Sequence, residues 1–184
     1  MAMRDTLDAL ARLLEYPGPD YRNDARECLR NAPPELAPLL EPFVAHVDAL
    51  SVEELQEQFI QTFDLNPVCS LEIGWHLFGE NYDRGLLLVR MRQQLRSHGL
   101  EESTELPDHL THALRLVGRM EREAGADFAA AVLLPALEKL LAAFSGKQNP
   151  FESLLLAARR AVRAEFPEVP ALAEPPQPAL RVLA

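Results

Sequence analysis

Three residue types that often take part in chemistry lie close together in the stretch CSLEIGWHLFGENYDRG, residues 69–85. They are Cys69, His76 and Trp75, the only tryptophan of the chain. A cysteine nucleophile needs a base and an electropositive setting that favours the thiolate, and His76 could share a helical face with Cys69. A helical cysteine among apolar neighbours is more often buried and unreactive. We therefore predict no catalytic residue in this stretch.

The histidines and acidic residues also lack a metal-binding pattern. A di-iron site in a helical bundle needs two Glu-x-x-His pairs and two further carboxylates. The nearest pairs, Glu72 with His76 and Glu105 with His109, each have three intervening residues. The two cysteines match no zinc spacing; two buried thiols are the better expectation, with a single disulfide as the alternative. No glycine-rich phosphate loop is present, so we predict neither a metal nor a cofactor.

The segment ELPDHL places Glu105, Pro107, Asp108 and His109 together. Proline is favoured as the first residue of a helix, so we expect a helix to begin at Pro107. The helix dipole stabilises Asp108 in the first turn but disfavours a charged His109, which predicts a neutral imidazole held by hydrogen bonds with Asp108 close by. Such a pair suits recognition as well as proton transfer, so an enzyme using Asp108 and His109 remains an alternative.

Aromatic residues are concentrated between residues 59 and 82. They are Phe59, Phe63, Trp75, Phe78 and Tyr82. Core packing is the ordinary explanation for any one of them. Tryptophan and tyrosine have polar tips that favour half-wet sites and interfaces. We therefore expect part of this set to line an open groove, with Trp75 as its main anchor.

The elements that must position these residues are helices, because apolar residues recur at three- and four-residue steps along almost the whole chain. Ser51 and Glu54 have the spacing of a capping box, and the chain should break between Asp64 and Pro67. The expected helices cover residues 3–14, 20–30, a segment ending near 49, 51–63, 70–98 with an interruption at Gly79 and a cap at Gly99, a segment from 107, one from 127 with a kink at Pro135, and 150–166. We predict an all-α fold: a single compact helical bundle over residues 1–166 and a proline-rich tail over 167–184.

Composition narrows the possible partners. The chain has 184 residues, 48% of them hydrophobic and 25% charged, with a net charge of -10. This charge argues against binding to nucleic acid and leaves room for a basic partner. The N-terminus has no apolar signal-peptide core, and no apolar run is long enough to span a bilayer. We therefore expect a cytoplasmic protein that does not insert into a membrane.

Three sequence pieces together resemble a known family: FIQTFDLNPVCSLEIGWHLFGE, RGLLLVRMRQQLRSHGL and ELPDHL. They look like the NarJ branch of the NarJ/TorD/DmsD redox-enzyme maturation chaperones. The family's aromatic-x-x-[Leu/Thr]-Phe element falls on Phe59, Thr62 and Phe63. Its Glu-Pro-x-Asp-His element is similar to Glu105, Pro107, Asp108 and His109, with Leu106 inserted before the proline. The resemblance extends in order from about Leu7 to Arg163.

The resemblance implies a dedicated chaperone and not an enzyme. Such proteins bind the N-terminal leader of an apo molybdoenzyme catalytic subunit and assist molybdenum cofactor insertion before membrane attachment or export. The client would be a respiratory nitrate reductase, or a related exported enzyme acting on ethylbenzene, dimethyl sulfide, selenate or chlorate, whose leader would carry twin arginines. The leader would lie in an apolar groove with an acidic rim, and we expect a monomer, with a minor dimer as the alternative. A helical adaptor for another partner is the remaining alternative.

The residues that we expect at the leader groove are Phe59, Phe63, Trp75, Phe78, Tyr82, Glu105, Pro107, Asp108 and His109.

Overall fold

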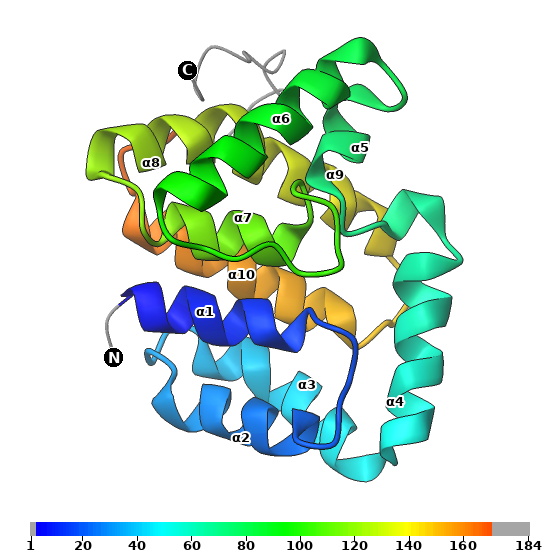
Figure 1. The fold of residues 1–184 in the computed structure, drawn as a ribbon. Coiled ribbons are helices and arrows are strands. Elements are labelled where there is room, and N and C mark those ends of the chain that lie inside the picture. The colour runs from blue at the N-terminus through cyan, green and yellow to red at the C-terminus, as the bar shows by residue number, and fades with distance from the viewer. Residues whose placement is uncertain (1–2, 171–184) are drawn as a thin grey trace.

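A computed structural model describes residues 3–170, and helices make up most of it (Figure 1). The α-helices are α1 (Met3–Leu13), α2 (Tyr21–Asn31), α3 (Ala37–Ala49), α4 (Val52–Phe59), α5 (Ile73–Phe78), α6 (Tyr82–Ser97), α7 (Leu110–Val117), α8 (Arg122–Phe128), α9 (Leu134–Phe144) and α10 (Phe151–Glu165). Within residues 3–170 there is no β-strand; the nearest feature is an isolated antiparallel bridge between Glu72 and His109. The predicted all-α fold is confirmed. Residues 171–184 of the predicted tail lie outside the described part.

The helices form two groups around a shared core. Figure 1 shows α2 and α3 below α1, and α5 to α9 above it, with α4 standing upright along one edge between the groups. Helix α1 packs on α7, α10 and α2, while α10 also packs on α3 and α9. Leu7, Leu10 and Ala11 of the apolar stripe of α1 are fully buried in this core, as their helical spacing predicts, and Met3 packs against it partly buried. Among the described residues, no helix is long and apolar enough to cross a membrane.

The start of α4 and the ends of α5 and α6 lie where the sequence predicts them. The Ser51 hydroxyl accepts a hydrogen bond from the Glu54 amide, and the Glu54 carboxylate accepts one from the Ser51 amide, which completes the capping box. Helix α4 continues as a π-helical turn, Ile60–Asp64, before the 3-10 turn Pro67–Cys69. Gly79 and Gly99 have φ values of 59° and 66°, and they end α5 and α6.

Three predicted helix starts are wrong. Helix α7 begins at Leu110 and not at Pro107, because the backbone before it makes contacts to another segment: the Ile73 amide donates to the Asp108 carbonyl, and the Leu110 amide donates to the Leu71 carbonyl. These contacts also delay the start of α5 to Ile73. Helix α8 begins at Arg122, five residues before the expected start.

The disturbance expected at Pro135 takes the form of a π-helical turn, Ala129–Leu133, between α8 and α9. Proline lacks an amide hydrogen and its ring collides with the preceding turn of a regular α-helix. The wider π-helical turn ends at Leu133, and Pro135 is the second residue of α9. Residues 122–144 are helical without a break, so the proline follows a π-helical turn inside one continuous helical segment.

Candidate functional site

A groove with a volume of about 430 Å³ opens between residues 59–75, Arg84 of α6 and residues 105–109. The end of α4 forms one side, the turn into α5 forms the second, and the loop before α7 forms the third. Its lining combines aromatic residues with carboxylates and one arginine: Phe59, Phe63, Asp64, Pro67, Ser70, Leu71, Glu72, Trp75, Arg84, Glu105, Leu106 and His109.

Five of the nine residues expected at a leader groove lie in this lining: Phe59, Phe63, Trp75, Glu105 and His109. The other four are elsewhere. Tyr82 is 77% exposed at the start of α6, and Phe78 is half-buried against the core. Pro107 and Asp108 are buried beneath the loop. The tertiary structure thus brings the three aromatic residues close to Glu105 and His109. It leaves the other four predicted residues, Tyr82 among them, outside the groove lining.

The floor of the groove is continuous with the hydrophobic core. Phe59 and Phe63 are only 5% and 4% exposed, and their ring centroids are 4.9 Å apart. Both rings also pack on Phe151 of α10, at 5.9 and 4.9 Å. Tyr16, which follows α1, stands edge-on to Phe59 at 5.8 Å and is half exposed. Sequence reasoning missed Tyr16, because its contact with α4 spans more than forty residues.

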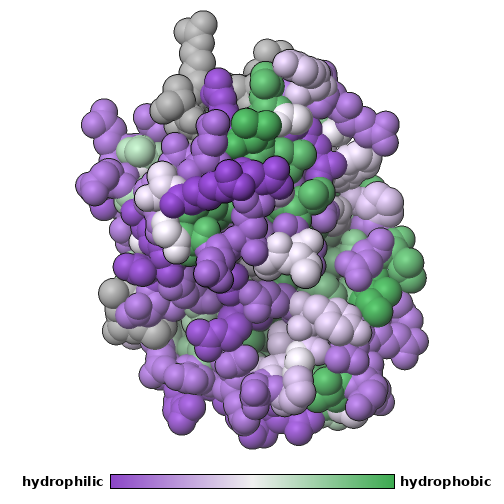
Figure 2. Space-filling model, viewed as in Figure 1, coloured by the Kyte–Doolittle hydropathy of each residue, from purple (hydrophilic) through white to green (hydrophobic). Residues whose placement is uncertain are grey.

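Exposed apolar side chains flank the groove. Leu65 and Val68, on either side of Pro67, are 73% and 57% exposed, and Leu106 is 45% exposed in the lining itself. Figure 2 shows that this face of the molecule is largely hydrophilic, with a hydrophobic patch at the edge where α4 ends. Apolar side chains gathered beside a concave surface are typical of an interaction site.

Three carboxylates, Asp64, Glu72 and Glu105, give the rim a negative charge. Partial burial raises the pKa of Asp64, and Glu72 raises it further. Burial also raises the pKa of Glu105, with added repulsion from Glu72 and Asp64. Of these three carboxylates, only Glu105 belongs to the set predicted from the sequence. Asp64 and Glu72 could have been predicted from their positions in the sequence. Asp64 directly follows Phe63, and Glu72 lies three residues before Trp75.

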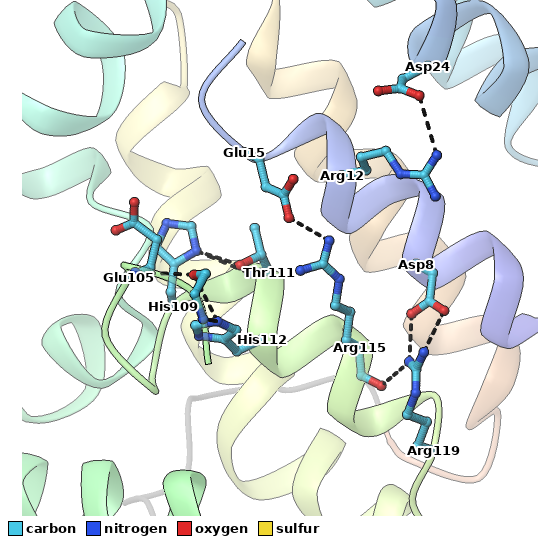
Figure 3. A network of polar contacts seen from close by, with 11 residues as sticks. Asp8, Arg12, Glu15, Asp24, Glu105, His109, Thr111, His112, Arg115 and Arg119 are labelled. Carbon is cyan, nitrogen blue, oxygen red and sulfur yellow. Dashed lines mark hydrogen bonds and ion pairs between the residues drawn. The ribbon is translucent and has the colours of Figure 1, made fainter. Parts of the chain in front are cut away.

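His109 caps α7 instead of lying in its first turn. Its Nδ1 atom accepts a hydrogen bond from the Thr111 amide and is 2.8 Å from the Thr111 hydroxyl (Figure 3). Burial lowers the pKa of His109 to about 4, so the ring is neutral at physiological pH. With Nδ1 as acceptor, the neutral ring carries its hydrogen on Nε2. The expected neutral imidazole agrees with this arrangement.

His112 shapes the loop that leads to His109. Its Nδ1 atom lies 2.9 Å from the Leu106 carbonyl, and its Nε2 atom accepts from the Ser103 amide at 3.2 Å. The ring is 1% exposed, so both contacts are shielded from water. The loop that supplies Glu105 and Leu106 is therefore held at both ends by one side chain.

Asp108 is fully buried and its partner is Arg84, not His109. Its Oδ2 atom accepts from Arg84 Nε at 3.1 Å, while Oδ1 has no hydrogen-bond partner among the described residues. Burial raises the pKa of Asp108, although Arg84 acts in the opposite direction. Because Asp108 has no exposed surface, its negative charge does not belong to the rim.

The remaining reactive groups are held in inert forms. Cys28 and Cys69 are buried free thiols, and burial raises the pKa of each, that of Cys28 to about 11. The Nε2 atom of His76 lies 2.6 Å from the Ser70 carbonyl, so His76 is engaged with the backbone and not with Cys69. Within residues 3–170, no three His, Cys, Asp or Glu side chains gather in a way that could hold a metal ion.

Comparison with known proteins assigns the family. Residues 24–154, more than two thirds of the chain and including every residue of the groove lining, match the model of the family described as nitrate reductase delta subunit. The chain belongs to this family. The resemblance to the NarJ/TorD/DmsD chaperones is thereby confirmed.

Two curated relatives share 32% identity with this chain over 118 residues. Both are described as nitrate reductase molybdenum cofactor assembly chaperone NarJ, one from Escherichia coli strain K12 and one from Escherichia coli O157:H7. The aligned region covers 60% of this chain and 50% of each relative. This chain of the nitrate reductase delta subunit family therefore spans about half the length of the curated relatives it matches.

Proposed function

We propose that this protein is a dedicated chaperone that binds the N-terminal segment of an apo molybdoenzyme catalytic subunit. It would keep that subunit competent for molybdenum cofactor insertion before membrane attachment or export. Support comes from its family and from the name of its relatives, which are molybdenum cofactor assembly chaperones. The relatives' name favours nitrate reductase as the client. An exported client with a twin-arginine leader is the second possibility.

The observation that carries the proposal is the groove with an apolar floor and an acidic rim. Apolar side chains of a bound helix or extended segment could pack on Phe59, Phe63 and Trp75. Cationic side chains of the same segment could approach the three rim carboxylates. The overall charge of -10 would speed the encounter with a basic segment. We propose that the protein works as a cytoplasmic monomer.

The geometry gives less support to an enzyme. An acid–base pair needs its two groups within hydrogen-bond reach. In the described part of the chain, Asp108 is paired with Arg84, His109 is paired with Thr111, and no hydrogen bond joins the Asp108 and His109 side chains. A groove that recognises a segment requires no such pair.

Calorimetry with a synthetic peptide tests the proposal. The peptide should correspond to about the first thirty residues of the catalytic subunit of a nitrate reductase from the same organism, so that it is longer than one groove-bound segment. We expect saturable binding with a negative heat-capacity change, affinity that falls with added salt, and a shift in Trp75 fluorescence.

Trp75→Ala should weaken peptide binding by about 2 kcal/mol or more, as removal of a central aromatic anchor does, with a smaller effect on stability because Trp75 is only half-buried. Tyr82→Ala is the matched control, since Tyr82 is an exposed aromatic outside the groove. Loss of binding in the Tyr82 variant but not in the Trp75 variant would move the binding surface away from the groove.

A further inference from the structure

Trp75 lies on α5, a helix too short to be stable without tertiary contacts. Helix α5 has six residues, is preceded by extended backbone and is ended by Gly79 with a positive φ of 59°. A helix this short is unstable by itself. The direction of the indole ring in the groove wall therefore depends on the tertiary contacts that α5 makes.

Arg84 provides one of these contacts. Its guanidinium carbon lies over the Trp75 ring, 5.8 Å from the centroid, within the range of a cation–π contact. Arg84 comes from the first turns of α6, and its side chain is 19% exposed. An arginine side chain loses much conformational entropy when it is held in one position. A second contact to Arg84, besides the indole, is therefore needed to keep its guanidinium over Trp75.

Asp108 is that anchor. Its Oδ2 atom receives the Nε hydrogen of Arg84 at 3.1 Å, and the carboxylate is fully buried. The backbone of Asp108 also accepts from the Ile73 amide at 2.9 Å, so the same residue is bonded to the start of α5 and to the arginine above its tryptophan. Gly74 makes this approach feasible, because a Cβ atom there would lie 2.5 Å from Oδ2 and 3.2 Å from Cγ of Arg84.

Stability alone does not account for the buried carboxylate. Its Oδ1 atom is buried with no hydrogen-bond partner among the described residues, and a buried ion pair is often no more stabilising than apolar residues of the same volume. A role in orienting a neighbouring group is a better reason to retain it.

We propose that Arg84 is a positioning residue that fixes Trp75 as an apolar wall of the groove, and that Asp108 acts through Arg84. The indole face beneath the guanidinium is closed to a cation of the ligand. The groove therefore presents Trp75 to an apolar or aromatic side chain of the bound segment and leaves the segment's cations to Asp64, Glu72 and Glu105. The part that concerns the ligand rests on the proposed function; the positioning of Trp75 does not.

Fluorescence of the free protein tests the positioning directly, since Trp75 is the only tryptophan. Arg84→Lys keeps the charge beside Asp108 but removes the planar guanidinium. The double variant Arg84→Met with Asp108→Asn removes both charges and so avoids an unpaired buried carboxylate. Arg92→Met is the control: Arg92 lies on the same helix and pairs with Glu102, outside the groove.

We expect acrylamide to quench Trp75 more efficiently in both Arg84 variants than in the wild type, with no change in the Arg92 variant. Affinity for the client peptide should fall about three- to ten-fold in both Arg84 variants, the size of one aromatic contact. Quenching and emission equal to wild type in both Arg84 variants would overturn the inference, even if their melting temperatures fell. If the wild-type protein binds no client peptide, the proposed function fails while the quenching result still decides the role of Arg84.

Discussion

At the scale of single residues, burial controls the protonation of the histidine in the groove. His109 is 5% exposed and its Nδ1 atom is used as the cap of α7. A proton added to the ring would have to displace the Thr111 amide or leave a charge in an apolar setting. The folded protein therefore favours the neutral ring, and this preference links stability to pH.

We predict that His109 makes the protein less stable as the pH falls from about 6.5 to about 4. The ordinary pKa of 6.5 is lowered to about 4 in the folded state. Between these values the unfolded chain binds a proton at His109 and the folded chain does not. The free energy of unfolding should therefore decrease across this window, by an amount on the order of 3 kcal/mol.

His109→Asn isolates this contribution, because asparagine can also cap a helix but does not titrate. The comparison with wild type is needed because the pKa values of Asp64, Glu105 and Asp108 are raised in the folded state. These carboxyl groups bind protons more readily when folded, so they stabilise the protein as the pH falls. Urea unfolding at pH 7 and pH 4.5 should show a smaller acid loss in the variant. Equal losses would exclude His109 as the cause.

At the scale of elements, the close contact of α5 with α6 and Asp108 depends on one glycine. A Cβ atom at Gly74 would lie 2.5 Å from Asp108 Oδ2 and 2.9 Å from a methyl carbon of Leu87. We predict that Gly74→Ala lowers the free energy of unfolding by about 1–3 kcal/mol, as overpacking of a tight core does. Urea unfolding with unchanged m-values would measure this directly.

Gly85→Ala is the control for Gly74→Ala. Gly85 lies inside α6, and a Cβ atom there would meet nothing within 4 Å. Alanine should therefore stabilise this helix by up to about 1 kcal/mol. Opposite signs for the two substitutions would locate the constraint at the α5–α6 contact. Stabilisation by both would mean that α5 can move away from Asp108 without loss.

At the scale of the whole molecule, ion pairs join the first helix to the middle of the chain. Arg119 binds both carboxylate oxygens of Asp8, at 2.6 and 2.8 Å, and Arg115 pairs with Glu15 (Figure 3). Each pair spans at least one hundred residues of sequence and closes the interface between α1 and α7. The pair of Asp8 with Arg119 is bidentate, which is the geometry in which arginine–carboxylate contacts are strongest.

We predict a coupling free energy of about 1 kcal/mol between Asp8 and Arg119 in a double-mutant cycle with alanine, decreasing with salt. The pair of Arg12 with Asp24 is the control, because its arginine side chain is 51% exposed and it makes a single contact at 3.3 Å. That pair should couple by less than about 0.5 kcal/mol. Equal coupling in both cycles would show that the α1–α7 interface gains nothing specific from Asp8.

The sequence by itself determined the class of the fold and much of its division into helices. Helical periodicity, the capping box at Ser51, the break before Pro67 and the glycines at 79 and 99 act over a few residues, so their effects can be read locally. The family motifs also lie in short segments, and together with the aromatic cluster that contains Trp75 they drew attention to Phe59, Phe63, Trp75, Glu105 and His109 in the lining of one groove.

Only the tertiary structure decided which residues meet. Asp108 and His109 are neighbours in sequence, but Asp108 pairs with Arg84, twenty-four residues away, and His109 caps α7. Because of the backbone contacts between residues 71–73 and 108–110, α5 and α7 begin three residues later than local sequence signals predict. The partner of a buried charge is selected by packing across the whole chain, because the cost of burial is offset only by the group that the fold brings within hydrogen-bond distance.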